Sequence, residues 1–337
     1  MKLLRWMLML MLAVGLGNCG KPAEKGSEKG GTEKDAAQGD KAQTIAVIPK
    51  GTAHPFWKTV HAGAMKAEQE LGVKIEWIGP ANEDDRKQQI DLVQTFIARK
   101  VSAIVLAPLD SVALKEPVES AAGRGIPVVI IDSGLQSEKQ SSFVATNNEQ
   151  GGRMAAQCLA KSMGGKGKAA MLRYSPGSAS TEDREAGFLA EMKEKFPEIE
   201  LVSTNQYAGV TKQSAMDNSQ NLLNKYGKEI QGLFCPNESS AFGMMQALEN
   251  SGFAGKINFV GFDASPGLVE GLRRGTVKGI VAQDPFDMGY QGVKTAVAAV
   301  KGETVSKRID TRVALITMEN IEAPEIKELI NPELENK

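Results

Sequence analysis

From residue 44 onward, short apolar segments alternate with longer segments in which apolar residues recur every three or four positions. The short segments include TIAVIP (44–49), AIVLAP (103–108) and IPVVIID (126–132), which have the length and composition of strands buried on both faces. The longer segment 55–72 opens with proline, closes with glycine and keeps its apolar residues on one helical face. This alternation predicts parallel sheets covered by helices.

The alternation continues over the whole chain from residue 44. We predict further strands at 73–78, 167–173, 199–207, 232–237, 257–263 and 278–283, and further helices at 84–99, 111–123, 181–195, 211–226, 239–250, 266–274 and 287–300. The predicted strands are more numerous than one lobe needs. The pattern therefore predicts an α/β fold with two doubly wound parallel-sheet lobes. In such sheets a ligand binds beyond the carboxyl ends of the strands.

Composition narrows the possible functions. The 337 residues carry 40 Lys and Arg against 41 Asp and Glu, a net charge of −1, which argues against a protein that coats nucleic acid. Two histidines give no metal-site pattern, and no cofactor is expected. Three cysteines make no disulfide framework, and we interpret Cys158 and Cys235 as separate buried residues rather than a disulfide pair.

The N-terminus has the pattern of an export signal. Lys2 and Arg5 precede an uncharged, mostly apolar run at 6–17, which is too short for a hydrocarbon core of about 30 Å. The sequence Leu16-Gly17-Asn18-Cys19 resembles a bacterial lipoprotein signal, and in that family the cysteine is lipidated and becomes the mature N-terminus. We therefore expect a signal peptide at 1–18 and a lipid anchor on Cys19. Asn18 departs from the usual small residue, so the alternative is an ordinary signal peptide with Cys19 there by chance.

The segment after Cys19 has the composition of a tether. Residues 20–43 contain five Lys, five Asp or Glu and five Gly, with no Val, Ile, Leu, Met or aromatic residue. Such a segment has no apolar surface to bury and does not offset its ordering entropy. We predict that 19–43 is a flexible link between a lipidated cysteine and a folded domain.

Seven motifs follow one another along the predicted domain: GTAHPFW (51–57), IPVVIID (126–132), ATNNEQGG (145–152), STEDREAGF (180–188), FCPNESSAFGM (234–244), VGFDASPG (260–267) and VAQDPFDMGYQGV (281–293). Together and in this order they resemble periplasmic sugar-binding proteins of the ribose and galactose type, a family related to the ligand-binding core of the lac-repressor family. The resemblance extends from about residue 45 to residue 317.

The resemblance implies an architecture and a partner. The family has two α/β lobes joined by three crossovers with the ligand in the cleft between them. Carried over, the N-terminal lobe is 44–146 plus 285–310, the C-terminal lobe is 147–284 plus 311–323, and 324–337 is a C-terminal tail. Closure of the lobes would present the bound solute to an ABC permease in the inner membrane. We expect a monomer in the periplasm or cell envelope, held at the membrane by its lipid anchor only.

The resemblance also implies eight ligand-binding residues at strand ends: His54, Phe56, Trp57, Asp132, Arg184, Asn237, Asp263 and Gln283. Aromatic rings suit the apolar C–H face of a sugar, and planar polar groups suit its hydroxyls. Each residue has a structural alternative. Asp132 is a possible strand-ending turn residue, Arg184 a possible surface ion-pair partner and Asn237 a possible helix start. Of Phe56 and Trp57, one is expected in the core, and we expect Phe56 to contact ligand.

Three positions depart from the ribose-type pattern: Ala107, Ser133 and the segment ending in Tyr207. They make ribose itself a poor candidate and leave the ligand open. The function predicted is a solute-binding protein that delivers a sugar or sugar-like ligand to an ABC importer. The alternative is a receptor of the same fold for chemotaxis or for autoinducer-2-type signalling. No hydrolase, metalloprotease, P-loop or dinucleotide motif is present, so we do not expect an enzyme.

Overall fold

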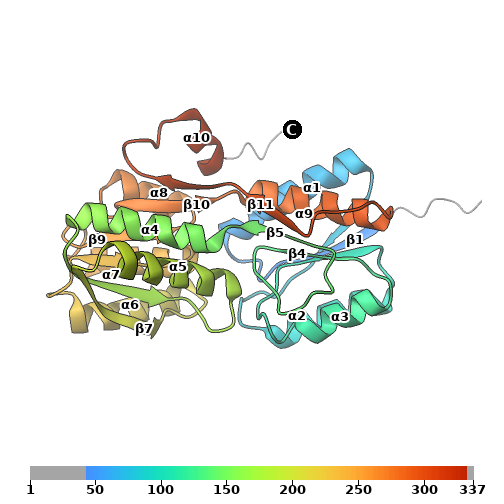
Figure 1. The fold of residues 1–337 in the computed structure, drawn as a ribbon, viewed down its shortest axis with the longest axis horizontal. Coiled ribbons are helices and arrows are strands. Elements are labelled where there is room, and N and C mark those ends of the chain that lie inside the picture. The colour runs from blue at the N-terminus through green and yellow to red at the C-terminus, as the bar shows by residue number, and fades with distance from the viewer. Residues whose placement is uncertain (1–42, 332–337) are drawn as a thin grey trace, which may run out of the picture. The chain divides into compact units, whose positions relative to one another are not determined.

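The computed structural model describes residues 43–331. The predicted signal peptide at 1–18, Cys19, the tether up to residue 42 and the last six residues of the chain lie outside the described residues. Within the described part, the strands form two six-stranded sheets, each with helices on both faces (Figure 1). We refer to each sheet with its helices as a lobe.

The first lobe contains a fully parallel sheet in the order β11-β5-β4-β3-β1-β2. Its strands are β1 (Thr44–Ile48), β2 (Lys74–Trp77), β3 (Ala103–Leu106), β4 (Val128–Ile131), β5 (Ser142–Thr146) and β11 (Arg308–Thr311). One face is covered by α1 (Pro55–Leu71) and α9 (Pro285–Val300), and the other by α2 (Arg86–Ala98) and α3 (Lys115–Gly123). Because Ile45 and Val47 pack under the first pair while Ala46 and Ile48 pack under the second, β1 is apolar without interruption.

The second lobe repeats this plan with the order β12-β10-β9-β8-β6-β7. Its strands are β6 (Gly167–Arg173), β7 (Ile199–Tyr207), β8 (Gly232–Phe234), β9 (Asn258–Phe262), β10 (Gly279–Gln283) and β12 (Val313–Ile316), of which β12 alone is antiparallel. Helices α4 (Asn148–Met163) and α5 (Ala179–Lys195) cover one face. The other face is covered by α6 (Lys212–Tyr226), α7 (Glu238–Asn250) and α8 (Pro266–Arg273).

The chain passes between the two sheets three times. It leaves the first sheet after β5 and enters α4, returns after β10 through α9, and leaves again between β11 and β12, where Arg312 is the single linking residue. Two of these crossovers lie next to each other, because the Thr146 hydroxyl donates to Gln283 Oε1 at 2.7 Å. The crossovers therefore come together beside the carboxyl ends of β5 and β10.

The sequence pattern gave no bounds for five elements: β5, α4, β11, β12 and α10 (Pro324–Ile330). Helix α4 carries a Gly151-Gly152 pair near its start, and glycine has low helix propensity. Tertiary packing overrides this propensity, since a Cβ on Gly152 would overlap the Arg184 carbonyl group of α5. The segment expected to be a tail contains α10, whose Ile326 is buried in the core of the second lobe.

Glycine also allows the close contact between α1 and α9. A Cβ on Gly289 of α9 would overlap the Val60 carbonyl oxygen, and a Cβ on Gly63 of α1 would overlap that of Phe286. We predict that Gly289→Ala lowers the free energy of unfolding by about 1–3 kcal/mol in urea denaturation, because the helices must move apart. The control is Gly123→Ala at the end of α3, where a Cβ meets nothing within 4 Å. A similar loss in both variants would contradict this explanation.

A candidate ligand-binding cleft between the lobes

The carboxyl ends of the strands in both sheets border one polar cleft, as expected for open α/β sheets. All eight residues predicted from the sequence line it, together with seven others. The full set is Lys50, His54, Phe56, Trp57, Glu83, Asp132, Tyr174, Ser178, Ser180, Thr181, Arg184, Asn237, Glu238, Asp263 and Gln283. Residues that lie far apart in the sequence are therefore brought together by the two sheets.

Asp132 and Asp263 occupy equivalent places in the two lobes, directly after β4 and β9. Both have left-handed backbone conformations, with φ of 62° and 71°, which are uncommon for residues other than glycine and costly to hold. Asp263 accepts hydrogen bonds from Gln283 Nε2 at 2.7 Å and from the Glu238 backbone N–H at 2.9 Å. Burial raises the pKa of Asp263 to about 6, although the nearby Arg184 and Gln283 favour its ionised form.

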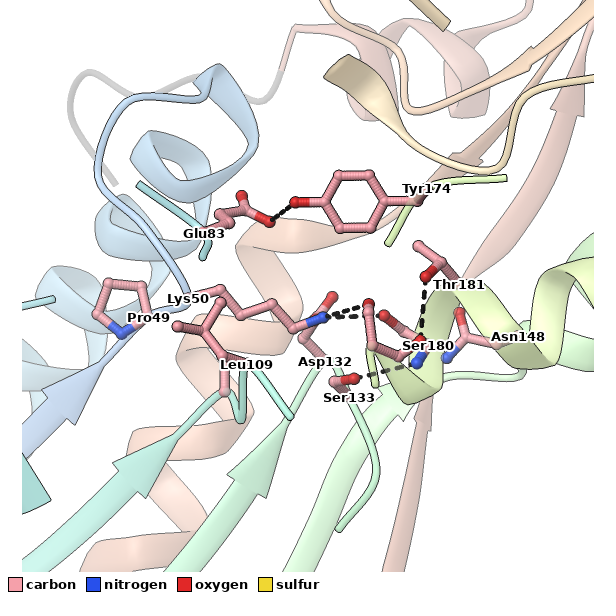
Figure 2. A network of polar contacts seen from close by, with 12 residues as sticks. Pro49, Lys50, Glu83, Leu109, Asp132, Ser133, Asn148, Tyr174, Ser180 and Thr181 are labelled. Carbon is pink, nitrogen blue, oxygen red and sulfur yellow. Dashed lines mark hydrogen bonds and ion pairs between the residues drawn. The ribbon is translucent and has the colours of Figure 1, made fainter. Parts of the chain in front are cut away.

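The Lys50 ammonium group connects the two lobes (Figure 2). It follows β1, is 3% exposed and pairs with Asp132 Oδ2 at 3.0 Å within the first lobe. It also donates to Ser178 Oγ at 3.2 Å and Ser180 Oγ at 3.1 Å in the second lobe. A third contact joins the same segments, since the Ser180 backbone N–H donates to Ser133 Oγ at 3.0 Å. The three protons of the ammonium group are thus all used inside the protein.

Arg184 is buried in the cleft wall, so the alternative of a surface ion pair is wrong. Its Nε donates to Asn148 Oδ1 at 2.8 Å and its Nη1 to the Pro236 carbonyl oxygen at 2.9 Å. The guanidinium group stacks on the Phe262 ring, 4.0 Å from its centroid. Its Nη2 has no hydrogen-bond partner among residues 43–331. This leaves one buried cationic donor available at the cleft.

Glu83 forms a second connection between the lobes. Its Oε1 accepts from Trp57 Nε1 at 2.7 Å in the first lobe, and its Oε2 accepts from the Tyr174 hydroxyl at 2.8 Å in the second (Figure 2). Trp57 is 3% exposed and belongs to the first-lobe core, whereas Phe56 is half-buried. The rings meet edge to face at 5.0 Å, and both line the cleft.

His54 lies between carboxylates of the two lobes. Its Nε2 is 3.9 Å from Glu83 Oε1 and its Nδ1 is 3.7 Å from Glu238 Oε2. Lys212 Nζ pairs with the other oxygen of Glu238 at 2.8 Å. Burial lowers the pKa of His54, but the nearby carboxylates of Glu238 and Glu83 outweigh it, so the pKa is raised. The imidazolium form therefore joins the first lobe to the second.

Asn237 and Gln283 have structural roles within the cleft as well. The Asn237 side chain accepts from the Ser240 backbone N–H and forms a capping box at the start of α7. The predicted helix start is therefore confirmed, and the same residue lines the cleft. The Gln283 amide joins Thr146 at one crossover to Asp263 in the second lobe.

The chain is similar to known proteins in both sequence and fold. Residues 45–304 match the family model described as the periplasmic binding protein domain. The chain belongs to the periplasmic binding protein family. It is 31% identical over 285 residues to the ribose import binding protein of Bacillus subtilis, covering 84% of this chain and 90% of that protein. It is 30% identical over 272 residues to the D-allose-binding periplasmic protein of Escherichia coli, covering 78% and 86% respectively.

Solved structures of the family agree with the fold. The carbohydrate transporter solute-binding protein of Agrobacterium radiobacter, in complex with D-arabinose, has a TM-score of 0.84 and 36% identity, covering 87% of this chain and 100% of that one. An ABC transporter solute-binding protein of Agrobacterium vitis with bound D-fucose has a TM-score of 0.81 and 34% identity, covering 85% and 99%.

Sequence reasoning missed part of the cleft of this periplasmic binding protein. Lys50 lies two residues after β1, and Glu238 lies four residues after β8. The strand-end rule that applies to Asp132 would therefore have found them. Glu83 lies in the loop before α2 and has no such signal. Ser178 and Ser180 belong to the start of α5, and only the folded structure shows that they face Lys50.

Other features of this periplasmic binding protein are structural. Asp110 lies outside the cleft lining and accepts from the backbone N–H groups of Val112 and Ala113 in the turn before α3. Cys158 and Cys235 are both free and buried, which confirms that they do not pair. Within residues 43–331, no three His, Cys, Asp or Glu side chains are grouped for a metal ion. In the same range no helix is long and apolar enough to cross a membrane.

The His54 contacts predict a pH dependence of stability. Because the folded-state pKa of His54 is raised above 6.5, its protonated form contributes stability below that value, and this contribution is lost as pH rises through the folded-state pKa. We expect the difference in unfolding free energy between the wild-type protein and His54→Gln to shrink from about pH 6 to about pH 8. Urea titrations at each pH measure it.

His61 is the matched control, because its pKa is shifted downward whereas that of His54 is shifted upward. It stacks on Trp77, and burial lowers its pKa despite the charge of Glu68. The stability difference between wild type and His61→Gln should therefore grow as pH rises. Parallel pH profiles for the two variants would contradict the assignment of the His54 effect to Glu83 and Glu238.

Proposed function

We propose that this chain is a lipid-anchored solute-binding protein that captures a sugar or sugar-like ligand between its lobes and delivers it to an ABC importer. The observation that carries the proposal is the cleft itself. Eight positions expected to bind sugar in the family come from both lobes of this chain and line one polar cleft. Relatives of the chain include binding proteins for ribose and allose, and solved structures similar to it hold arabinose and fucose.

The chemistry of the cleft suits a polyhydroxylated ring. Asp132 and Asp263 accept hydrogen bonds from sugar hydroxyls. The unpartnered Nη2 of Arg184 donates a hydrogen bond to a ring or hydroxyl oxygen. The exposed part of Phe56 offers an apolar face to the C–H groups of the ring. A sugar that leaves one of these buried groups unpaired loses about 1–3 kcal/mol of binding, which makes the cleft selective.

Capture requires the lobes to separate and close again. The space between the lining side chains is only about 30 Å³, far below the range of about 300–1,000 Å³ that is usual for small-molecule sites. A sugar therefore enters when the contacts of Lys50 with Ser178 and Ser180, and of Glu83 with Tyr174, are broken. We propose that 44–146 with 285–310 and 147–284 with 311–323 move as two bodies about the three crossovers.

We further propose that the protein has an ABC permease as its partner and catalyses no reaction. The closed form is the species that an ABC permease in the inner membrane recognises, and the protein acts as a monomer that performs no chemical reaction on its ligand. The cleft groups are used to hold one another and a ligand: Glu83 accepts two hydrogen bonds, and Lys50 uses its three protons.

A thermal-shift panel tests the binding function. We expect one sugar among pentoses, hexoses and sugar alcohols to stabilise the protein by about 2.7 kcal/mol at a hundredfold excess over Kd. Asp132→Asn should abolish the shift, because it removes an acceptor and the partner of Lys50. Asp217→Asn on the exposed side of α6 is the matched control and should keep it. The proposal fails if no sugar shifts the melt and mass spectrometry of the denatured protein finds no bound solute.

The mass of the mature N-terminus tests the anchor. If Cys19 is lipidated, the N-terminal peptide of the membrane-bound protein begins at Cys19 and carries the mass of acyl chains. Cys19→Ser should release the protein from the membrane fraction. An unmodified N-terminal peptide from the wild-type protein would show that the chain has an ordinary signal peptide instead.

A further inference from the structure

A second pocket adjoins the cleft. It measures about 450 Å³, and Phe56, Glu238, Asp263 and Gln283 line both it and the cleft. Its other walls come from the first turns of α1, the starts of α8 and α9, and the end of α10. We call this space the side pocket. Its volume lies within the range of about 300–1,000 Å³ that is usual for small-molecule sites.

Ser265 supplies a buried polar group without a partner in the side pocket. It occupies the N-cap position of α8, where a serine hydroxyl usually accepts from the first turn, but its side chain makes no such bond. The residue is 8% exposed, and its Oγ has no hydrogen-bond partner among residues 43–331. A buried hydroxyl without a partner is costly, and a ligand hydroxyl in the side pocket would supply one.

The remaining walls combine apolar surface with a few polar groups, among them Lys58 and the carboxylates of Glu238 and Asp263. Pro266, Pro285, Leu329 and Ile330 provide the apolar part, and α10 brings the last two into place. The Glu238 carboxylate borders the pocket where it meets the cleft, and it retains acceptor capacity beside Lys212 and His54. Apolar walls with a few polar groups match a second sugar ring, which has both C–H faces and hydroxyls.

We propose that the side pocket is a second subsite, so that the protein binds a glycoside with one ring in the cleft and the next ring against Ser265 and α10. This inference rests on the proposed sugar-binding function. It narrows the ligand class from a free monosaccharide to a sugar that bears a second ring.

Calorimetry with matched ligands tests the subsite. The probes are D-ribose, D-allose, D-arabinose and D-fucose, each as the free sugar, as its methyl glycoside and as its glucosyl disaccharide. We expect at least one disaccharide to bind the wild-type protein about tenfold or more tightly than both the free sugar and the methyl glycoside. Disaccharides that bind no better than the free sugar would overturn the subsite and leave the proposed function intact. If no probe of any kind binds, the subsite proposal fails, while the proposed function still depends on the thermal-shift panel and on mass spectrometry of the denatured protein.

Two variants test whether the tighter binding of a disaccharide depends on the side pocket. Ser265→Ala should weaken disaccharide binding about fivefold and leave the free-sugar affinity and the melting temperature unchanged, since its hydroxyl has no partner among residues 43–331. Thr59→Trp should fill the side pocket and remove the disaccharide advantage. Thr95→Trp on α2 is its control, because both threonine hydroxyls bond the carbonyl four residues earlier and Thr95 lies outside the pocket. An advantage that survives Thr59→Trp would overturn the assignment.

The chain's own C-terminus is the competing occupant. Six residues follow Asn331, which lines the side pocket. A variant that ends at Asn331 is titrated with the same probes. Equal disaccharide affinity in the shortened and wild-type proteins supports the subsite. A disaccharide advantage that appears only after the shortening would mean that the C-terminus fills the pocket in the intact protein, and would overturn the proposal.

Discussion

The buried ammonium group of Lys50 is the interaction on which the closed cleft depends. A buried charge without partners costs several kcal/mol, so it must be surrounded by acceptors. Asp132 supplies one from the first lobe, and Ser178 and Ser180 supply two from the second. The full set of partners exists only when the lobes are together. Closure is therefore favoured by the protein's own groups, and a ligand adds to an arrangement that is already largely complete.

Packing between helices places the cleft residues as much as their own chemistry does. The first turn of α1 carries Phe56 and Trp57, and α9 begins directly after the crossover at Gln283. Gly63 and Gly289 each pack against a backbone carbonyl group of the other helix, so the two helices lie close together. The position of the aromatic pair is therefore tied to that crossover. A contact between small residues outside the cleft lining thus helps to set the position of the aromatic pair at the cleft.

The strained and buried groups of the cleft show where stability is given up for binding. Asp132 and Asp263 hold left-handed conformations, and Asp263 is buried with a raised pKa. Arg184 Nη2, in the lining of the cleft, and Ser265 Oγ, in the lining of the side pocket, have no partner among residues 43–331. Such groups are rare in protein interiors unless a ligand completes them. Their positions outline one continuous site that runs from the cleft into the side pocket.

The sequence by itself determined the alternation of strands and helices, because burial on both faces of a parallel sheet leaves an unbroken apolar segment such as β1. It also indicated the strand-end positions of Asp132 and Asp263, since a sheet's carboxyl edge is fixed by the direction of its strands. Only the tertiary structure decided that α4 forms despite Gly152, that Glu83 reaches Tyr174, and that α10 closes the side pocket. These features depend on contacts between segments far apart in the chain, and local propensity and periodicity carry no information about such contacts.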